Sequence, residues 1–379
     1  MRICFFTSAN SLQGGAELCM ALIVKHLLEE GHDVHVVLPQ RSELTAHYES
    51  MGAKIHVLYW QHLQRLSDPV HVLQYLFWLP IVTVRLARLL RRERIDLLHV
   101  NEILDFQGLA AARMAGVPAI THVRTILPMI PMRRVLARIA LSLADRVVCV
   151  SHAVHRMALG GCSNPGIRVI YDGGPDANSF DPDKVSPVRV PEAGDGLVIG
   201  MVAKLVRAKG HLLLLDLACS LRDLGYDDLH YVIVGGPVTG HEHYAAEVRR
   251  QIEARGLGGR VHMLGRQRDV TGYLAGMDIV CHLPLWEDPF PGVPMEAAVM
   301  RKPVLSFISG GVPEELTHPT SARLVPIGDI NALAEHAREL IEDPKLCRRL
   351  GESARREVLS KFSMEEHFAQ VDALYREMV

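Results

Sequence analysis

The sequence lacks the features that mark several classes of protein. Its seven cysteines are an odd number, stand singly and form no C-x-x-C pair, which argues against a disulfide framework and a zinc site. The formal net charge of −2 offers no basic field for a nucleic-acid backbone. No N-x-S/T sequon occurs. These absences favour a globular enzyme with free thiols in a reducing cytoplasm and no nucleic-acid partner.

Long hydrophobic runs are also missing. The apolar start, residues 2–7, is too short for a secretory signal and predicts a buried strand instead. The longest uncharged stretch, residues 69–84, contains histidine, glutamine and proline and falls below the length of a spanning helix. We therefore predict no transmembrane segment.

What is present predicts two α/β domains. A chain of 379 residues with 49% hydrophobic content fits two domains of ordinary size, and residues 176–196, rich in Asp, Pro, Ser and Gly, form the clearest boundary. On both sides apolar runs alternate with helical patterns, as in a mostly parallel, doubly wound sheet. The predicted strands are residues 2–7, 33–38, 54–59, 96–100, 119–122 and 146–150, then 197–202, 230–234, 261–264 and 278–281.

The stretch 286–316 carries the strongest sign of a ligand site. A Pro/Gly turn leads into a helix start, where the N–H groups of Gly292 and Val293 can bind a phosphate or diphosphate. Asp288 and Glu296 flank this start and can accept hydrogen bonds from sugar hydroxyls. By composition alone, an ordinary loop–helix–strand unit explains the stretch equally well.

Two other glycine-containing loops follow predicted strands. Gly14 and Gly15 lie where a Rossmann-like fold places its ligand-facing turn. Lys204 and Lys209, followed by Gly210, can neutralise a phosphate, and the alternative is a solvated basic loop.

Patterns that resemble metal sites are weaker. The D-x-D at residues 181–183 lies in the boundary segment, and the H-x-H at residues 241–243 has no further ligands nearby, so neither predicts a metal site. His122 follows a buried strand, where a histidine is on general grounds more often structural than catalytic.

Taken in order along the chain, these motifs resemble those of the family 4 retaining glycosyltransferases. The resemblance rests on GGAE at residues 14–17, VAKLVRAKG at 202–210, VGGP at 234–237, DPFPGVPMEA at 288–297 and SGGVPEE at 309–315. It implies an α/β protein of GT-B fold, in which two Rossmann-like, doubly wound domains face each other across a cleft. The expected domains are residues 1–178 with the returning C-terminal helix 361–379, and residues 179–360.

The resemblance also implies an activity. A hexose-type sugar would move from a nucleotide diphosphate, UDP- or GDP-linked, to an acceptor hydroxyl with retention of anomeric configuration and without a metal or other cofactor. The acceptor would be a glycan or a lipid-linked molecule. A nucleotide-sugar epimerase or hydrolase of the same architecture and a donor-binding protein that has lost its activity are the alternatives.

Residue roles follow from the same resemblance. The implied catalytic residues are His122, which faces the donor sugar from the first domain, Asp288 on the sugar hydroxyls, and Lys209 on the diphosphate. The implied donor-binding residues are Gly14, Gly15, Lys204, Lys209, Arg266, Gly292, Val293 and Glu296, with Glu296 on the ribose and Arg266 beside the base. Three positions depart from the family pattern: Asp288 stands for Glu, Lys204 for Arg and Asp172 for Asn. Arg124, two residues after His122, is a further candidate contact for acceptor or phosphate.

Two segments are both basic and apolar, residues 85–94 and 128–142, the second with Arg133, Arg134 and Arg138 at helical spacing. Two helices that cover a sheet are the plainer interpretation. The alternative is a basic amphipathic surface that rests on an anionic membrane, on its inner face, beside a lipid-linked acceptor.

Overall fold

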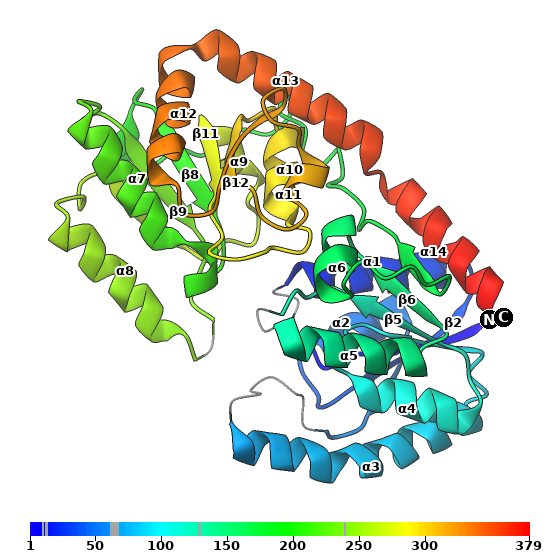
Figure 1. Ribbon diagram of the computed structural model, residues 1–379. Coiled ribbons are helices and arrows are strands. Elements are labelled where there is room, and N and C mark those ends of the chain that lie inside the picture. The colour runs from blue at the N-terminus through cyan, green and yellow to red at the C-terminus, as the bar shows by residue number, and fades with distance from the viewer. Residues whose placement is uncertain (10, 12–13, 61–67, 128–129, 239) are drawn as a thin grey trace. The chain divides into compact units, whose positions relative to one another are not determined.

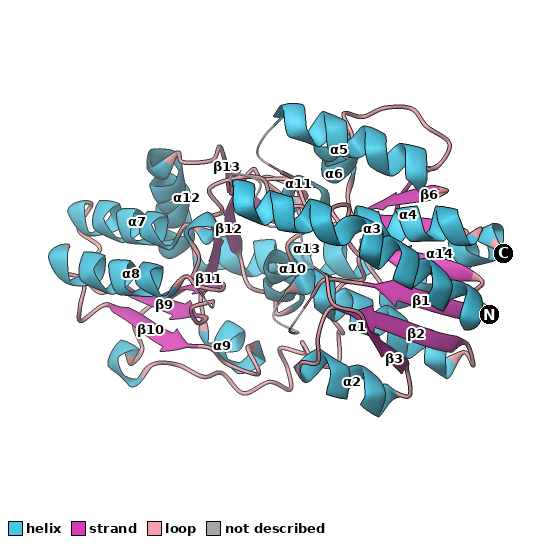
Figure 2. Ribbon diagram, turned by 90° about the horizontal axis from the view of Figure 1, so that it is seen from below, coloured by secondary structure: helices cyan, strands magenta, loops and turns pink. Residues whose placement is uncertain are grey.

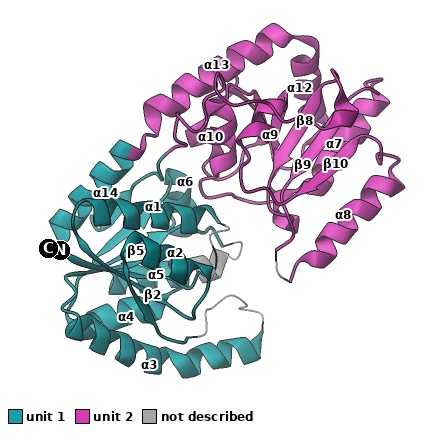
Figure 3. Cartoon of the chain, turned by 180° about the vertical axis from the view of Figure 1, so that it is seen from behind, with its two compact units in different colours: residues 1–173, 365–379 teal, residues 174–364 magenta. Residues whose placement is uncertain are grey.

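The computed structural model describes the chain from Met1 to Val379 except residues 10, 12–13, 61–67, 128–129 and 239, and except the side chains of residues 130–133. The described chain divides into two compact units (Figure 3). Unit 1 contains residues 1–173 and 365–379, and unit 2 contains residues 174–364. In each unit strands and helices alternate along the chain around a parallel sheet (Figure 1).

The sheet of unit 1 has seven described strands in the order β3-β2-β1-β4-β5-β6-β7. They are β1 (Arg2–Phe6), β2 (Asp33–Leu38), β3 (Lys54–Val57), β4 (Leu97–Val100), β5 (Ala119–Val123), β6 (Arg146–Cys149) and β7 (Ile167–Val169), and every neighbouring pair is parallel. The central strands β4 and β5 are buried along their whole length. Continuous apolar runs such as these are expected where helices cover both faces of a sheet.

Helices cover both faces of this sheet (Figure 2). One core is formed with α1 (Gly15–Glu29), α2 (Glu43–Met51) and α14 (Met364–Met378), and the other with α3 (Pro69–Arg92) and α4 (Phe106–Ala115). Next to α4 lies α5 (Ile130–Leu143), followed in the chain by α6 (His152–Ala158). The side chains of Val371, Leu374 and Tyr375 place the C-terminal helix in the core of unit 1.

Unit 2 has six described strands in the order β10-β9-β8-β11-β12-β13, again all parallel. They are β8 (Val198–Val202), β9 (His230–Val234), β10 (Val261–Gly265), β11 (Ile279–His282), β12 (Val304–Phe307) and β13 (Ala322–Val325). The helices are α7 (His211–Asp223), α8 (Glu242–Ala254), α9 (Thr271–Gly276), α10 (Gly292–Val299), α11 (Val312–Glu315), α12 (Ile330–Glu342) and α13 (Pro344–Lys361), with short 3-10 turns at Pro191–Ala193 and Arg207–Lys209.

The loops that follow the strands of unit 2 meet at one edge of the sheet, because all of its strands run in the same direction. The loop after β8 lies against the loop after β11 at Gly210. This glycine has φ +72°, and a Cβ there would collide with the carbonyl oxygen of Leu283. Only glycine accepts both constraints without strain, so Gly210 brings the two loops together.

One described helix, α3, is long and apolar enough to cross a membrane by length and composition alone. Of its most apolar stretch, 28% is buried in the structure, and Pro80 lies inside the helix. Its start is stabilised by Asp68, whose carboxylate accepts hydrogen bonds from the N–H groups of Val70 (3.0 Å) and His71 (3.4 Å).

Candidate functional site

An ion pair stands at the carboxyl edge of the unit 2 sheet. Lys209, the last residue of the 3-10 turn after β8, donates to the carboxylate of Asp288, which lies on the loop after β11. His282, the last residue of β11, places Nε2 3.5 Å from the same carboxylate. Burial lowers the pKa of His282 to about 4, so this imidazole is neutral at physiological pH. Burial alone would raise the pKa of Asp288, but Lys209, His282 and Lys204 together outweigh it, and the pKa is lowered.

Backbone hydrogen bonds hold Asp288 against the loop after β12. The N–H of Asp288 donates to Ser309 Oγ (2.9 Å), and its carbonyl accepts from the N–H of Gly311 (2.9 Å). Gly310 has φ +48°, and a Cβ there would collide with the carbonyl of Asp288. Its N–H donates to the carboxylate of Glu287 at 2.5 Å. The two glycines therefore allow the close approach that holds the site carboxylate in place.

The start of α10 offers backbone donors next to this pair. Gly292 and Val293 are its first two residues, after Pro291 at the N-cap, whose side chain makes no capping hydrogen bond. N–H groups in a first helical turn have no acceptor within the helix, so they and the helix dipole favour an anion. The carboxylate of Glu296, one turn further, folds back toward Gly292, since a Cβ on that glycine would stand 3.5 Å from Glu296 Oε1. Burial raises the pKa of Glu296 to about 7.

The remaining residues predicted in this unit stand on neighbouring loops. Lys204 is exposed after β8 and contributes to lowering the pKa of Asp288. Arg266 is exposed after β10, and its Cβ lies against Gly236 in the turn after β9. Arg207, on the same turn as Lys209, forms an ion pair with Glu247 at 2.7 Å. The structure thus joins Lys209 directly to Asp288, whereas Arg266 lies against the turn after β9.

Two ionisable residues of this neighbourhood were not predicted. His282 ends a buried strand, and the strand-end argument that singled out His122 would have found it, had the strand been extended by one residue. Glu315, the last residue of α11, is fully buried, and its pKa is raised well above its usual range by burial and then by the charge of Asp288. Nothing in the sequence separates it from the adjacent Glu314.

In unit 1, Gly14 is the N-cap of α1 and Gly15 is its exposed first residue. The carboxylate of Glu17 folds back over Gly14, in the space that a Cβ on that glycine would fill. The two glycines therefore start a helix at the carboxyl end of β1, which is the position predicted for a ligand-facing turn.

His122, on β5, lies inside unit 1. Its side chain is buried, its Nδ1 is 3.2 Å from the Arg124 guanidinium, and its ring stacks on His99 with centroids 5.4 Å apart. Arg124 in turn forms a buried ion pair with Asp172. Burial, followed by the Arg124 charge, lowers the pKa of His122 well below its usual range. This ion pair accounts for the carboxylate at residue 172.

The patterns that resemble metal sites have other partners. Asp183 binds Arg301 through two hydrogen bonds of 2.8 and 2.9 Å, and Asp181 pairs with Lys184 at 2.9 Å. Within the described ranges no group of three or more His, Cys, Asp or Glu side chains is arranged to hold a metal ion. The seven cysteines are unpaired; Cys4, Cys149 and Cys281 are buried and the other four are partly exposed.

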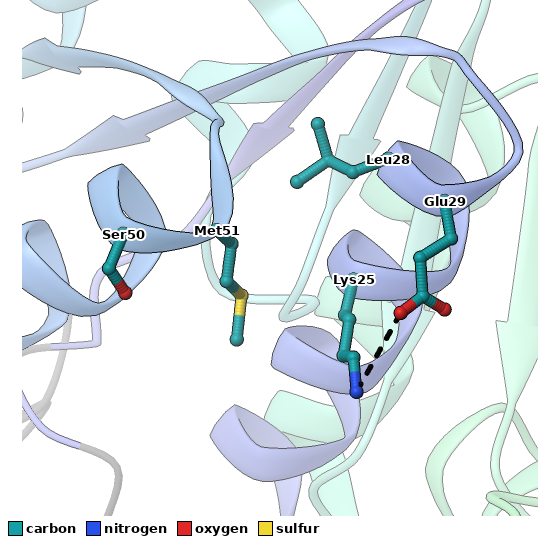
Figure 4. Close-up of a pocket in the computed structure, with 5 residues that line it drawn as sticks. All are labelled: Lys25, Leu28, Glu29, Ser50 and Met51. Atoms are coloured by element: carbon teal, nitrogen blue, oxygen red, sulfur yellow. Dashed lines mark ion pairs between the residues drawn. The ribbon is translucent and has the colours of Figure 1, made fainter.

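A pocket of about 480 Å³ lies elsewhere, in unit 1 (Figure 4). It is lined by residues near the C-terminal ends of α1 and α2, namely Lys25, Leu28, Glu29, Ser50 and Met51, and Lys25 and Glu29 form an ion pair at 3.7 Å. Ligands of parallel sheets bind at the opposite ends of such helices, next to the carboxyl ends of the strands.

Comparison with known proteins places the chain in a family. The family model described as Glycosyltransferase Family 4 matches residues 13–174, and the model described as Glycosyl transferases group 1 matches residues 185–357. N-acetyl-alpha-D-glucosaminyl L-malate synthase of Bacillus anthracis is 24% identical over 97% of this chain and 94% of its own.

Solved structures show the same fold. Anabaena HepE in complex with UDP has a TM-score of 0.82 at 23% identity and covers 100% of both chains. The same protein in complex with UDP-glucose has a TM-score of 0.81 at 22% identity, again over 100% of both chains. With the two matched regions in chain order, the fold is GT-B. The chain belongs to the family 4 glycosyltransferases.

Proposed function

We propose that this glycosyltransferase takes a sugar from a nucleotide diphosphate and transfers it to an acceptor hydroxyl with retention of anomeric configuration. The observation that carries the proposal is the Lys209–Asp288 ion pair beside the open start of α10. A lysine and a helix N-terminus suit a diphosphate, and a fixed carboxylate suits sugar hydroxyls. Glu296 lies one helical turn away, within reach of a ribose bound at the same helix start.

The donor is proposed to be UDP-linked, with a GDP-linked sugar as the alternative. HepE, of the same fold, has been crystallised with UDP and with UDP-glucose, which supports a uridine donor. Arg266, exposed beside the turn after β9, is the proposed neighbour of the base.

In the proposed reaction, the bond between the anomeric carbon and the diphosphate oxygen breaks while the acceptor oxygen bonds to the same face of that carbon. The acceptor proton passes to an oxygen of the departing diphosphate. The growing negative charge is stabilised by Lys204, Lys209 and the N–H groups that start α10, without a metal ion. Asp288 positions the sugar and forms no bond to it, so a trapped covalent sugar on Asp288 would contradict this mechanism.

Unit 1 is proposed to supply the acceptor side, with the loop at Gly14 and Gly15 near the donor phosphates and His122 at the reacting sugar. Because His122 is 1% exposed in this structure, its proposed role requires that the groups covering it move when substrates bind.

Calorimetric titration with UDP-, GDP-, ADP- and dTDP-linked sugars tests the donor site. Binding of one nucleotide class should weaken at least about tenfold in Lys209→Ala and in Glu296→Ala, because each removes a ligand-facing group. Arg207→Ala is the matched control, since it removes the same charge from the same turn but leaves the Lys209–Asp288 pair intact. Absence of binding to every nucleotide, or equal losses in all three variants, would refute the proposed site.

We further propose that the acceptor is a glycan or a lipid-linked molecule and that unit 1 rests on the inner face of an anionic membrane. The first half of α3 exposes Val70, Leu73, Leu76 and Phe77, each more than half exposed. The helix contains no acidic residue, and its second half exposes Arg85 and Arg88, which have no ion-pair partner among the described residues. An apolar face next to free cations fits an anionic lipid surface.

The side chain of Arg133 lies outside the described residues, whereas Arg134 and Arg138 on α5 are exposed.

Co-sedimentation with vesicles of phosphatidylcholine and phosphatidylglycerol tests the surface of α3. Leu73→Gln with Phe77→Gln should abolish sedimentation, and Leu18→Gln with Leu22→Gln, two exposed leucines on α1, should leave it unchanged. No sedimentation of the unaltered protein would refute membrane contact.

A further inference from the structure

One buried ionisable side chain next to the donor site has no role in the proposed reaction. Glu315 has no exposed surface, and neither of its carboxyl oxygens has a hydrogen-bond partner among the described residues. Leaving a buried carboxyl without a partner costs free energy, so its presence needs a physical reason. The charges that act on it belong to Asp288, Glu314 and Lys209.

The backbone keeps Glu315 in this position. Gly311, which donates to the Asp288 carbonyl at 2.9 Å, also accepts from the N–H of Glu315 at 3.2 Å. Gly311 is itself packed closely, since a Cβ there would collide with Pro289 and Phe290 on the Asp288 loop. The segment that holds the backbone of Asp288 is therefore the same segment that carries Glu315.

We propose that Glu315 is a positioning residue of the donor site, whose carboxylic-acid O–H holds the Asp288 carboxylate while the diphosphate of the donor competes for Lys209. This inference rests on the proposed function. In the present structure Lys209 is the ion-pair partner of Asp288. A diphosphate attracts the same ammonium group, and a buried carboxylate that loses its cation needs another donor to stay in place.

The protonation states fit this arrangement. Burial, and then the neighbouring negative charge of Asp288, raises the pKa of Glu315 well above its usual range, which favours the protonated carboxylic acid. His282 is neutral at physiological pH and supplies at most one ring N–H, at 3.5 Å. No proton changes owner in this step, because Glu315 only donates a hydrogen bond to Asp288.

Two substitutions separate this role from simple packing. Glu315→Gln keeps an N–H donor of similar size, so its affinity for UDP-glucose should stay within about threefold of the unaltered protein. Glu315→Leu has no donor, and its affinity for UDP-glucose should fall at least about tenfold while its affinity for UDP alone changes less than about twofold. Asp288 contacts only the sugar end of the donor in the proposed site, so the substitution should change the affinity for UDP-glucose and not the affinity for UDP.

The pH dependence of the preference for UDP-glucose over UDP is a second measurement, and it should not change if Glu315 only fills space. As Glu315 ionises with rising pH, against the charges of Asp288 and Glu314 and despite Lys209, the preference for UDP-glucose over UDP should decline in the unaltered protein. Glu315→Gln should keep that preference across the same range. His282, Lys204 and the other charges of the site are unchanged in this variant, so they cancel in the comparison.

The outcomes distinguish the two proposals. If the leucine variant prefers UDP-glucose over UDP as strongly as the unaltered protein does, the role of Glu315 is overturned, but the proposed function is not. Equal losses of UDP-glucose affinity in the glutamine and leucine variants would overturn that role in the same way. Failure of the unaltered protein to bind any nucleotide diphosphate would overturn the proposed function, and this inference with it. The leucine variant should melt no lower than the unaltered protein, because it removes an unpaired polar group from the interior.

Discussion

Replacing Glu296 with glutamine should stabilise the ligand-free protein at alkaline pH. Burial raises the pKa of Glu296 to about 7, from an ordinary value of 4.5. An acid with a raised pKa holds its proton more tightly in the folded chain than in the unfolded chain. The free energy of unfolding therefore falls as the pH rises from about 4.5 to about 7, and it stays low above that range.

The size of this effect follows from the pKa difference. A shift of about 2.5 units corresponds to about 3 kcal/mol, which is an upper bound because the side chain is partly exposed. Glutamine keeps the shape of the side chain and cannot ionise. At about pH 8, unit 2 of the Glu296→Gln variant should therefore unfold with up to about 3 kcal/mol more free energy than the unaltered protein, and the gap should close near about pH 4.5.

Urea unfolding followed by circular dichroism, repeated across this pH range, measures the gap. Both proteins keep Glu315, so the comparison isolates Glu296. Glu335→Gln on α12 is the control, because that glutamate is exposed and its replacement should leave the pH dependence unchanged. The reasoning is refuted if Glu296→Gln is no more stable than the unaltered protein at about pH 8, or if the gap is the same at all pH values.

Two further predictions concern contacts inside a single unit, one in unit 1 and one in unit 2. Asp172→Asn should destabilise unit 1 by about 3 kcal/mol because it leaves the buried Arg124 unpaired. Adding Arg124→Met should recover most of that stability, and thermal unfolding of the single and double variants measures both effects. Destabilisation in the double variant equal to the sum of the two single substitutions would contradict this. Gly310→Ala should lower the melting temperature and also weaken nucleotide-sugar binding, because Gly310 has φ +48° and a Cβ there would collide with Asp288. The control is Gly328→Ala, where φ is +84° but a Cβ would meet no atom. It should lower the stability by only about 1 kcal/mol and leave binding unchanged. Unchanged binding in Gly310→Ala would show that the site tolerates movement of this loop.

The order of strands and helices could be predicted because each strand is a short apolar run between turn residues. β2 and β9 have the predicted bounds, Asp33–Leu38 and His230–Val234. β3 ends at Val57, two residues earlier than predicted. The helix predicted from Gly108 begins two residues earlier, at Phe106, and the additional residue Gln107 is buried and accepts a hydrogen bond from Tyr75 on α3.

The parts of the site that depend on backbone could also be predicted, whereas side-chain contacts could not. Glycine turns and a proline-bounded helix start leave a pattern in the sequence, which located Gly292, Gly310 and Gly210. The sequence contains no comparable pattern that shows which side chain faces inward. Glu314 and Glu315 are adjacent and identical, and only the phase of the four-residue helix α11 decides that Glu315 is the buried one.

The Arg124–Asp172 pair also bears on which unit binds the diphosphate. Arg124 was a candidate contact for phosphate, but its guanidinium is buried and already paired with a carboxylate. Drawing it out toward a ligand would leave Asp172 buried without a partner, which costs more than a surface contact returns. In unit 2, by contrast, Lys204 is exposed and Lys209 pairs at the edge of the site. Nucleotide diphosphate affinity should therefore depend on the unit 2 lysines, with Arg124 acting through the stability of unit 1.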